Sequence, residues 1–146
     1  MVHFSGTEAI NAPPERVWAF LMDPQRFTAC APAMRNVRVK SGHEFSFDIN
    51  APGRTVKFDA RWEERREPSY AKLRMEGGGR LLGRARLDNE FRITPQGDGS
   101  SSVAWSSDVE ISGMMGSLLS DDRLRTMVNE MNQDVIACIR REIESS

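Results

Sequence analysis

Few residues of this 146-residue sequence have the types and the spacing that catalysis or metal binding requires. The two histidines are His3, close to the first residue, and His43, in a predicted turn, and neither has Cys, Asp or Glu at ligand spacing. A Ser-His-Asp or Cys-His arrangement would have to use the same two histidines, and no Gly-x-Ser-x-Gly motif is present. We therefore expect no metal site, no cofactor and no nucleophilic catalysis.

The glycine-rich segment at residues 77–83, GGGRLLG, does not have the features of a nucleotide-binding loop. No strand-glycine-helix context follows it, and the Gly-Lys-Ser/Thr of a phosphate-binding loop is missing. We interpret this segment as the turn of a β-hairpin.

Three polar side chains fall in the apolar phase of predicted strands. Because side chains alternate between the two faces of a strand, an inward-facing Ile10 places Glu8 inward, and the same alternation places Asn89 and Ser107 among core residues. A carboxylate in an apolar cavity could serve as an acid, a base or a ligand anchor. Alternatively, a bulge at Gly6 turns Glu8 outward, or Glu8 lies at a solvated rim, and the other two are ordinary core residues.

Alternating apolar and polar residues dominate the middle of the chain and predict an antiparallel sheet with one buried and one wet face. The apolar positions are even-numbered from Thr55 to Glu63 and odd-numbered from Leu81 to Thr94, with mostly charged residues in the other phase. With the runs at 2–10, 37–39, 45–49, 73–75 and 103–111, about seven strands are expected. The arginines of the polar phase are interpreted as a solvated face paired with acidic neighbours.

Two regions have helical signals. Residues 13–15, Pro-Pro-Glu, suit a first helical turn, and an apolar stripe follows until Asp23-Pro24, after which a second short helix is expected over 24–30. Apolar residues at helical spacing from Leu124 to Ile143 predict a long C-terminal helix that covers the sheet. The polar turn at 120–123 either kinks this helix or caps its start.

The large apolar residues are numerous enough to line a pocket between the sheet and the C-terminal helix. The chain has eight methionines, whose flexible thioethers suit a cavity for varied apolar ligands but also fill ordinary cores. Tyr70 is expected to pack at a strand end. The candidate ligand-binding residues are Glu8, Phe20, Phe27, Phe47, Phe58, Trp62, Met75, Asn89, Phe91, Trp105, Ser107, Met115, Met127 and Met131.

The composition fits one ordinary soluble domain over residues 1–146. Twenty Lys and Arg against twenty-one Asp and Glu give a net charge of −1, which removes the electrostatic reason to expect nucleic acid or an anionic membrane as partner. Neither a signal peptide nor an apolar run long enough to span a membrane is present, so a cytoplasmic location is expected. Cys30 and Cys138, both among apolar neighbours, are interpreted as buried free thiols.

The segment at residues 10–24, INAPPERVWAFLMDP, resembles the opening signature of the SRPBCC (START-related, helix-grip) superfamily. Within it the chain is most similar to the CoxG group, named for a carbon monoxide dehydrogenase, through Cys30-Ala31-Pro32-Ala33, Gly77-Gly78-Gly79 and Ser112-Gly113-Met114-Met115-Gly116. Ala33 stands where that group has a turn glycine. The resemblance implies an α+β helix-grip fold, with a seven-stranded antiparallel sheet wrapped around a long C-terminal helix, two short helices between strands 1 and 2, and a hydrophobic cavity.

Three functions follow from the sequence and this resemblance. The first is non-enzymatic binding of an apolar small molecule or lipid in the cavity. The second, implied by the CoxG group, is an accessory or recruitment factor that docks on a molybdenum-hydroxylase-type enzyme. The third is a polyketide cyclase-like or hydrolase-like enzyme with Glu8 as general acid or base. A fold alone does not decide among them.

Overall fold

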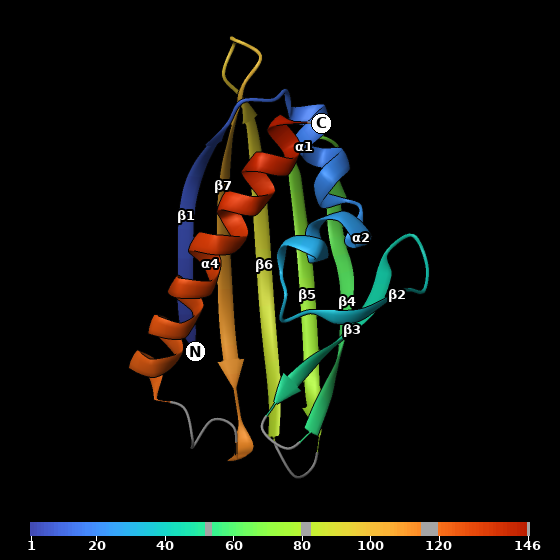
Figure 1. The fold of residues 1–146 in the computed structure, drawn as a ribbon, viewed down its shortest axis with the longest axis vertical. Helices are drawn as coiled ribbons and strands as arrows, with labels where there is room; N and C mark the ends of the chain where they lie inside the picture. The colour runs from blue at the N-terminus through green and yellow to red at the C-terminus, as the bar shows by residue number, and fades with distance from the viewer. Residues whose placement is uncertain (52–53, 80–82, 115–119, 146) are drawn as a thin grey trace.

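The computed structural model describes residues 1–51, 54–79, 83–114 and 120–145. Its strands form one antiparallel seven-stranded sheet in the order β1-β7-β6-β5-β4-β3-β2, which confirms the predicted sheet (Figure 1). The helices α1 (Pro14–Leu21), α2 (Pro24–Phe27) and the short η1 (Thr28–Cys30) lie between β1 and β2 in the chain, and α4 (Asp121–Glu144) comes last. The strands are β1 (Val2–Ile10), β2 (Arg35–Val39), β3 (Glu44–Ala51), β4 (Arg54–Arg66), β5 (Tyr70–Gly79), β6 (Gly83–Pro95) and β7 (Ser101–Ile111).

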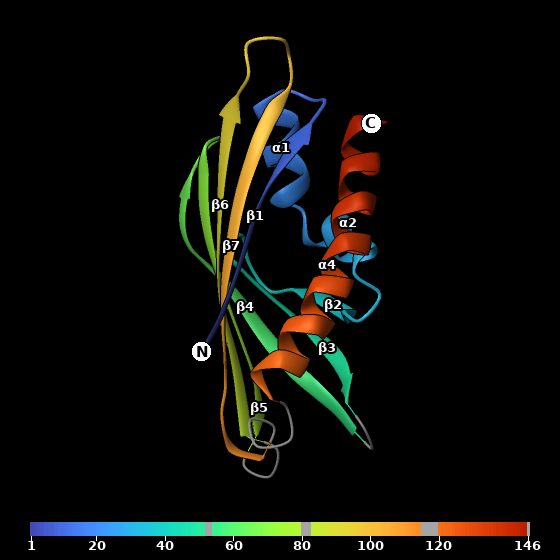
Figure 2. The same ribbon diagram turned by 90° about the vertical axis from the view of Figure 1, so that its left-hand side faces the viewer.

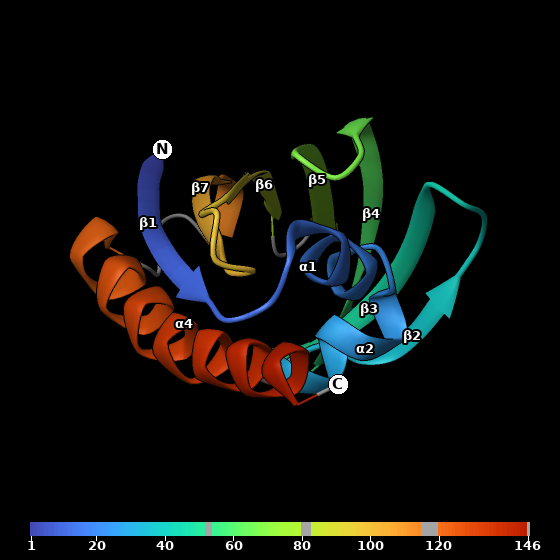
Figure 3. The same ribbon diagram turned by 90° about the horizontal axis from the view of Figure 1, so that it is seen from above.

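All the helices lie on one side of the sheet. The sheet curves towards them, and α4 runs diagonally along the open side of the curve (Figures 2 and 3). We call the side that faces the helices the covered face and the opposite side the outer face. A half-polar sheet of this kind buries its apolar phase only if another element covers it, and the helices do so here.

The helix starts follow from local sequence. Proline at the first position opens both α1 and α2, and the Asp23 carboxylate accepts a hydrogen bond of 3.1 Å from the Gln25 backbone N–H. At the start of α4 the Ser120 hydroxyl oxygen accepts from the Arg123 backbone N–H at 3.2 Å. The polar turn at residues 120–123 is therefore the cap and first turn of α4. The predicted apolar extension at residues 115–119 lies outside the described residues.

The main core surrounds α1. Val17 and Phe20 of α1 are 0% and 2% exposed, and they belong to one buried cluster with the aromatic side chains of β3 and β4. Phe47 and Phe58, which are cross-strand partners, stack with ring centroids 5.5 Å apart. We call this cluster the main core. Its buried aromatic members besides Phe20 are Trp18, Phe45, Phe47, Phe58 and Trp62.

The glycines at 77–79 are part of strand β5 and not of a turn, as the sequence had suggested. They pair with residues 83–85 of β6, and the connection at 80–82 lies outside the described residues. Gly77 is required by packing, because a Cβ there would lie 2.5 Å from Cδ1 of Phe58. The predicted turn at 52–53 also lies outside the described residues.

The two cysteines form a disulfide, so their interpretation as free thiols was wrong. Cys30 at the end of η1 is bonded to Cys138 of α4, with 5.6 Å between the two Cα atoms. Their separation of 108 residues leaves no local sequence signal for the pairing. Only the packing of η1 against α4 brings them together.

The outer face is charged, as the alternation predicts. The Arg74 guanidinium lies 2.9 Å from Asp88 and 3.4 Å from Glu63, and Arg86 lies 3.1 Å from the other Asp88 oxygen. Burial by itself would raise the pKa of Asp88, but the hydrogen bond and charge of Arg74, with a contribution from Arg86, leave that pKa below its ordinary value. These contacts solvate the outer face and leave the covered face as the apolar one.

Candidate functional site

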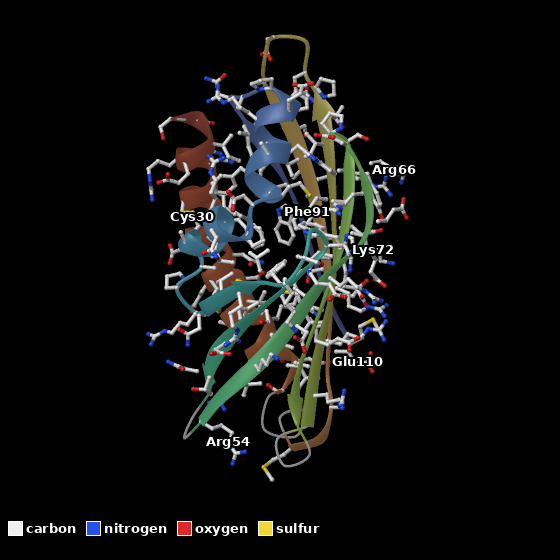
Figure 4. All side chains as sticks on the ribbon, turned by 90° about the vertical axis from the view of Figure 1, so that its right-hand side faces the viewer. Cys30, Arg54, Arg66, Lys72, Phe91 and Glu110 are labelled. Atoms are coloured by element: carbon white, nitrogen blue, oxygen red, sulfur yellow. A yellow bond between two sulfur atoms is a disulfide. The ribbon has the colours of Figure 1, made fainter. Side chains whose placement is uncertain are left out.

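The apolar phase of four neighbouring strands makes up the part of the covered face under α4. The register of β1 on β7 and of β7 on β6 is continuous, so residues of one phase stay on one side throughout. Figure 4 shows Phe91 on the side of the helices, whereas Arg66, Lys72 and Glu110 lie on the outer side. Phe91, paired with Trp105 of β7, therefore marks the covered face of β6.

The covered face is closed at its two ends. At one end the main core lies under α1 and includes Ile143 of α4, which is 1% exposed. At the other end Leu124, in the first turn of α4, is 8% exposed. We call the second group the Phe4 cluster, and it consists of Val2, Phe4, Val109 and Leu124.

Between these clusters the covered face keeps accessible surface. Leu87, Phe91 and Trp105 are only half-buried, although β6 and β7 are interior strands of the sheet. Their accessibility therefore does not come from a sheet edge, and α4 leaves this part of the face incompletely covered. We call this region the central patch, and it consists of Met75, Leu87, Asn89, Phe91, Trp105 and Ser107.

Trp105 lies against the backbone of Gly6. The two residues are paired across β7 and β1, and a Cβ on Gly6 would lie 2.8 Å from Cζ2 and 2.9 Å from Nε1 of the indole. Gly6 thus makes room for the indole and causes no bulge. The buried indole Nε1 has no hydrogen-bond partner among the described residues. An unpaired buried donor is uncommon in a folded protein and calls for an explanation.

Asn89 and Ser107 are direct cross-strand partners in the middle of the patch. Asn89 is 8% exposed, and its amide nitrogen donates a 3.2 Å hydrogen bond to the backbone oxygen of Leu73 on β5. Ser107 is half-buried. Both residues therefore lie on the covered face, where strand alternation placed them.

Glu8 also lies on the covered face, because the continuous register of β1 leaves no bulge to turn it outward. Its carboxylate accepts a 2.7 Å hydrogen bond from Nη2 of Arg140 on α4, and Nε of the same arginine donates to the Ala9 backbone oxygen at 3.1 Å. The Glu8 and Arg140 side chains are 26% and 40% exposed. Glu8 thus holds the helix to the sheet edge.

The predicted pocket residues divide into two groups by burial. Phe20, Phe47, Phe58 and Trp62 are at most 7% exposed and fill the main core, while Phe27 is half-buried with its ring centroid 5.8 Å from that of Phe45. Met131 of α4 is 48% exposed. Met115 lies outside the described residues, and the side chain of Met127 is not described. The residues that the structure brings together in the central patch are Met75, Asn89, Phe91, Trp105 and Ser107.

Leu87 is the member of the central patch that the sequence reasoning did not single out. It packs against both the main core and the Phe4 cluster, as does Ile111. Val128 of α4 also packs on the Phe4 cluster. Leu87 shares the odd phase of β6 with Asn89 and Phe91, so strand alternation could have identified it.

Two further chemical features are absent from the described part of the chain. Among residues 1–51, 54–79, 83–114 and 120–145, no three His, Cys, Asp or Glu side chains come together as a metal site would need. Within the same ranges, no helix has both the length and the apolar character needed to cross a lipid bilayer.

A long helix packed on the concave side of a seven-stranded antiparallel sheet defines the helix-grip fold of START-related proteins, and solved structures of that class are similar. A conserved protein from Geobacillus kaustophilus has a TM-score of 0.83 at 20% identity, covering 99% of this chain and 97% of that one. A START superfamily protein from Mycobacterium smegmatis has a TM-score of 0.74 at 15% identity, covering 98% and 97%. The Zhui aromatase/cyclase from a Streptomyces species has a TM-score of 0.75 at 15% identity, covering 97% and 93%. At these identities the likeness shows the fold alone.

The family follows from the sequence match. Residues 6–144 match the profile of the CoxG family, the G-type subunits of carbon monoxide dehydrogenase. The chain belongs to this family. No curated protein matches the sequence significantly.

Proposed function

We propose that this protein binds an apolar small molecule or a lipid between the central patch and α4. The observation that carries the proposal is the accessible surface on Leu87, Phe91 and Trp105, which face the helix from interior strands. Burying such surface under a ligand is favourable by roughly 25 cal/mol per Å². Polar groups among apolar side chains, as Asn89 and Ser107 are here, are typical of small-molecule sites because they orient the ligand.

The proposed role is binding without catalysis. A catalytic Glu8 would need its carboxylate free to exchange a proton with the ligand. In the structure that carboxylate is bonded to Arg140 at 2.7 Å, and it lies near the end of β1 away from the Phe4 cluster. The contact favours a structural role, and the variant Glu8→Gln is expected to keep ligand binding.

A second function, compatible with the first, is association with a carbon monoxide dehydrogenase or a related molybdenum hydroxylase. The match to the CoxG family supports it. The purified protein would be mixed with such an enzyme from the same organism and analysed by size-exclusion chromatography. Co-elution supports docking, and separate elution over a range of concentrations contradicts it.

A cytoplasmic site of action remains part of the proposal. Disulfides persist mainly in oxidising compartments, so the Cys30–Cys138 bond makes the location testable. Alkylation of intact cells before lysis would trap both cysteines in their cellular redox state. Largely reduced thiols support the cytoplasm, and a complete disulfide in living cells contradicts it.

The binding site itself is tested with a matched pair of variants on β7. Ser107 and Ser106 are adjacent, but Ser107 faces the central patch and Ser106 pairs with Glu90 of the outer face. Native mass spectrometry after exposure to a mixed lipid extract would measure what each variant retains. Ser107→Phe is expected to lose the ligand by filling the patch, and Ser106→Phe is expected to keep it. Equal retention by both variants, with both folded, contradicts a site at the central patch.

A further inference from the structure

Three polar groups in the central patch have unused hydrogen-bonding capacity, and this extends the proposed function on which the inference rests. The buried Nε1–H of Trp105 has no acceptor among the described residues. The Asn89 amide uses a nitrogen to reach the Leu73 backbone, and within the described part of the chain its Oδ1 atom receives no hydrogen bond. The Ser107 hydroxyl, over the same residues, is also without a hydrogen bond.

These groups are neighbours on one face. Asn89 and Ser107 are opposite each other on β6 and β7, and Trp105 is two residues before Ser107, which places all three side chains on the covered face. Gly6, opposite Trp105, carries no side chain that could complete the set. The surrounding residues of the patch, Leu87, Phe91 and Met75, are apolar.

The set contains both donors and acceptors. The indole N–H can only donate, the Asn89 Oδ1 atom can only accept, and the Ser107 hydroxyl can do either. A carbonyl oxygen would satisfy the indole and leave Asn89 unpaired. A hydroxyl accepts from Trp105 and donates to Asn89, and so satisfies both.

The charges on this face argue against an ionised head group. In the covered phase of β1, β5, β6 and β7, Glu8 is the only charged residue described, and it is paired with Arg140. A carboxylate or phosphate in the patch would therefore lose its hydration without gaining a free counter-charge. We propose that Trp105, Asn89 and Ser107 form a subsite for the hydroxyl group of an uncharged apolar alcohol.

Access to this subsite depends on the first half of α4. Trp105 and Val128 both pack against the Phe4 cluster, and Arg125 reaches the His3 backbone oxygen only at 3.5 Å. The other end of α4 is held by the disulfide and by Arg140. A displacement of the first half of the helix, with the second half fixed, would open a path to the indole N–H.

The test compares three probes that differ only at the head: dodecanol, dodecanoate and dodecane. Each displaces Nile red, a neutral dye whose fluorescence reports an apolar environment, from the purified full-length protein. Dodecanol is expected to bind at least about tenfold more tightly than dodecanoate. Trp105→Phe and Ser107→Ala are each expected to weaken dodecanol by about three- to tenfold, as for loss of one neutral hydrogen bond, and to leave dodecane unchanged. Ser106→Ala on the outer face is the control.

The outcomes separate this inference from the function on which it rests. If neither Nile red nor any of the probes binds, the proposed function fails. If Nile red and dodecane bind but dodecanol and dodecanoate have equal affinities, the protein binds apolar ligands and the hydroxyl subsite is overturned. Equal weakening of dodecanol and dodecane in Trp105→Phe also overturns it, because that result indicates lost packing. Circular dichroism confirms that each variant is folded.

Discussion

Cys30 and Cys138 join the end of η1 to the second half of α4, with 5.6 Å between their Cα atoms. Other contacts fasten the same end of the helix. Arg140 bonds Glu8 at 2.7 Å, the Asn11 backbone N–H donates to Glu144 at 2.9 Å, and Arg16 donates to the Ile143 backbone oxygen at 2.7 Å. The second half of α4 is therefore the fixed part of the helix.

Removing the disulfide is expected to lower stability substantially. The bond closes a loop of 108 residues, and a loop of about that length restricts the unfolded chain by an amount worth roughly 2–5 kcal/mol. The double variant Cys30→Ala/Cys138→Ala should lose that much free energy of unfolding in urea titrations. Dithiothreitol should destabilise the wild type similarly and leave the variant unaffected. A wild type insensitive to the reductant, with free thiols confirmed, contradicts the prediction.

The Glu8–Arg140 pair is expected to stabilise the protein modestly, because both side chains keep contact with solvent. A double-mutant cycle of Glu8→Gln and Arg140→Met should give a coupling free energy of roughly 1 kcal/mol that decreases in high salt. The pair Arg66–Glu64, with side chains 63% and 51% exposed, is the control and should give a coupling near zero. Equal couplings for the two pairs would mean that Glu8 does not anchor α4.

Gly6→Ala is expected to displace the Trp105 indole. The added Cβ would lie 2.8 Å from the ring, which is too close for a carbon–carbon contact. Overpacking of this kind costs about 1–3 kcal/mol and should change the tryptophan fluorescence and the near-ultraviolet circular dichroism. Gly42→Ala is the control, since nothing lies within 4 Å of its Cβ position. If the two variants are equally stable, the indole does not lie against Gly6.

Tyr70, the only tyrosine of the chain, should ionise at unusually high pH. Its hydroxyl donates a 2.5 Å hydrogen bond to Glu90, and this bond, with burial, raises the pKa of Tyr70 above its ordinary value of 10.0. The unfolded chain then loses its tyrosine proton first, so the associated stability is complete below pH 10.0 and declines as the pH rises above that value.

An absorbance titration of tyrosinate in the folded protein measures this pKa directly. Glu90→Gln should move the pKa of Tyr70 towards 10.0, because the carboxylate charge is removed. Arg92 is the control position, because Arg92→Met removes a cation stacked on the ring at 4.7 Å and should raise the pKa further. A wild-type titration with a midpoint at or below the ordinary value is incompatible with the Tyr70–Glu90 bond.

The secondary structure was predictable because each element has a local cause. Alternation defined strands such as β6, proline and Asp23 marked the starts of α1 and α2, and Ser120 marked the start of α4. Alternation also placed Asn89 and Ser107 on the covered face, since a side chain's face depends only on its phase within the strand. The sequence left open whether Gly6 forms a bulge, because a strand glycine indicates either a bulge or a close contact.

The tertiary structure decided what depends on distances between remote segments. Glu8 and Arg140 are 132 residues apart, and Cys30 and Cys138 are 108 apart, so no local pattern could pair them. Phe58 and Phe91 look alike in sequence, since both alternate with charged residues. Packing around α1 buries Phe58, whereas Phe91 lies where α4 covers the sheet incompletely. The sequence by itself determined which residues face the helix, and only the packing of α1 and α4 decided which of them remain open to a ligand.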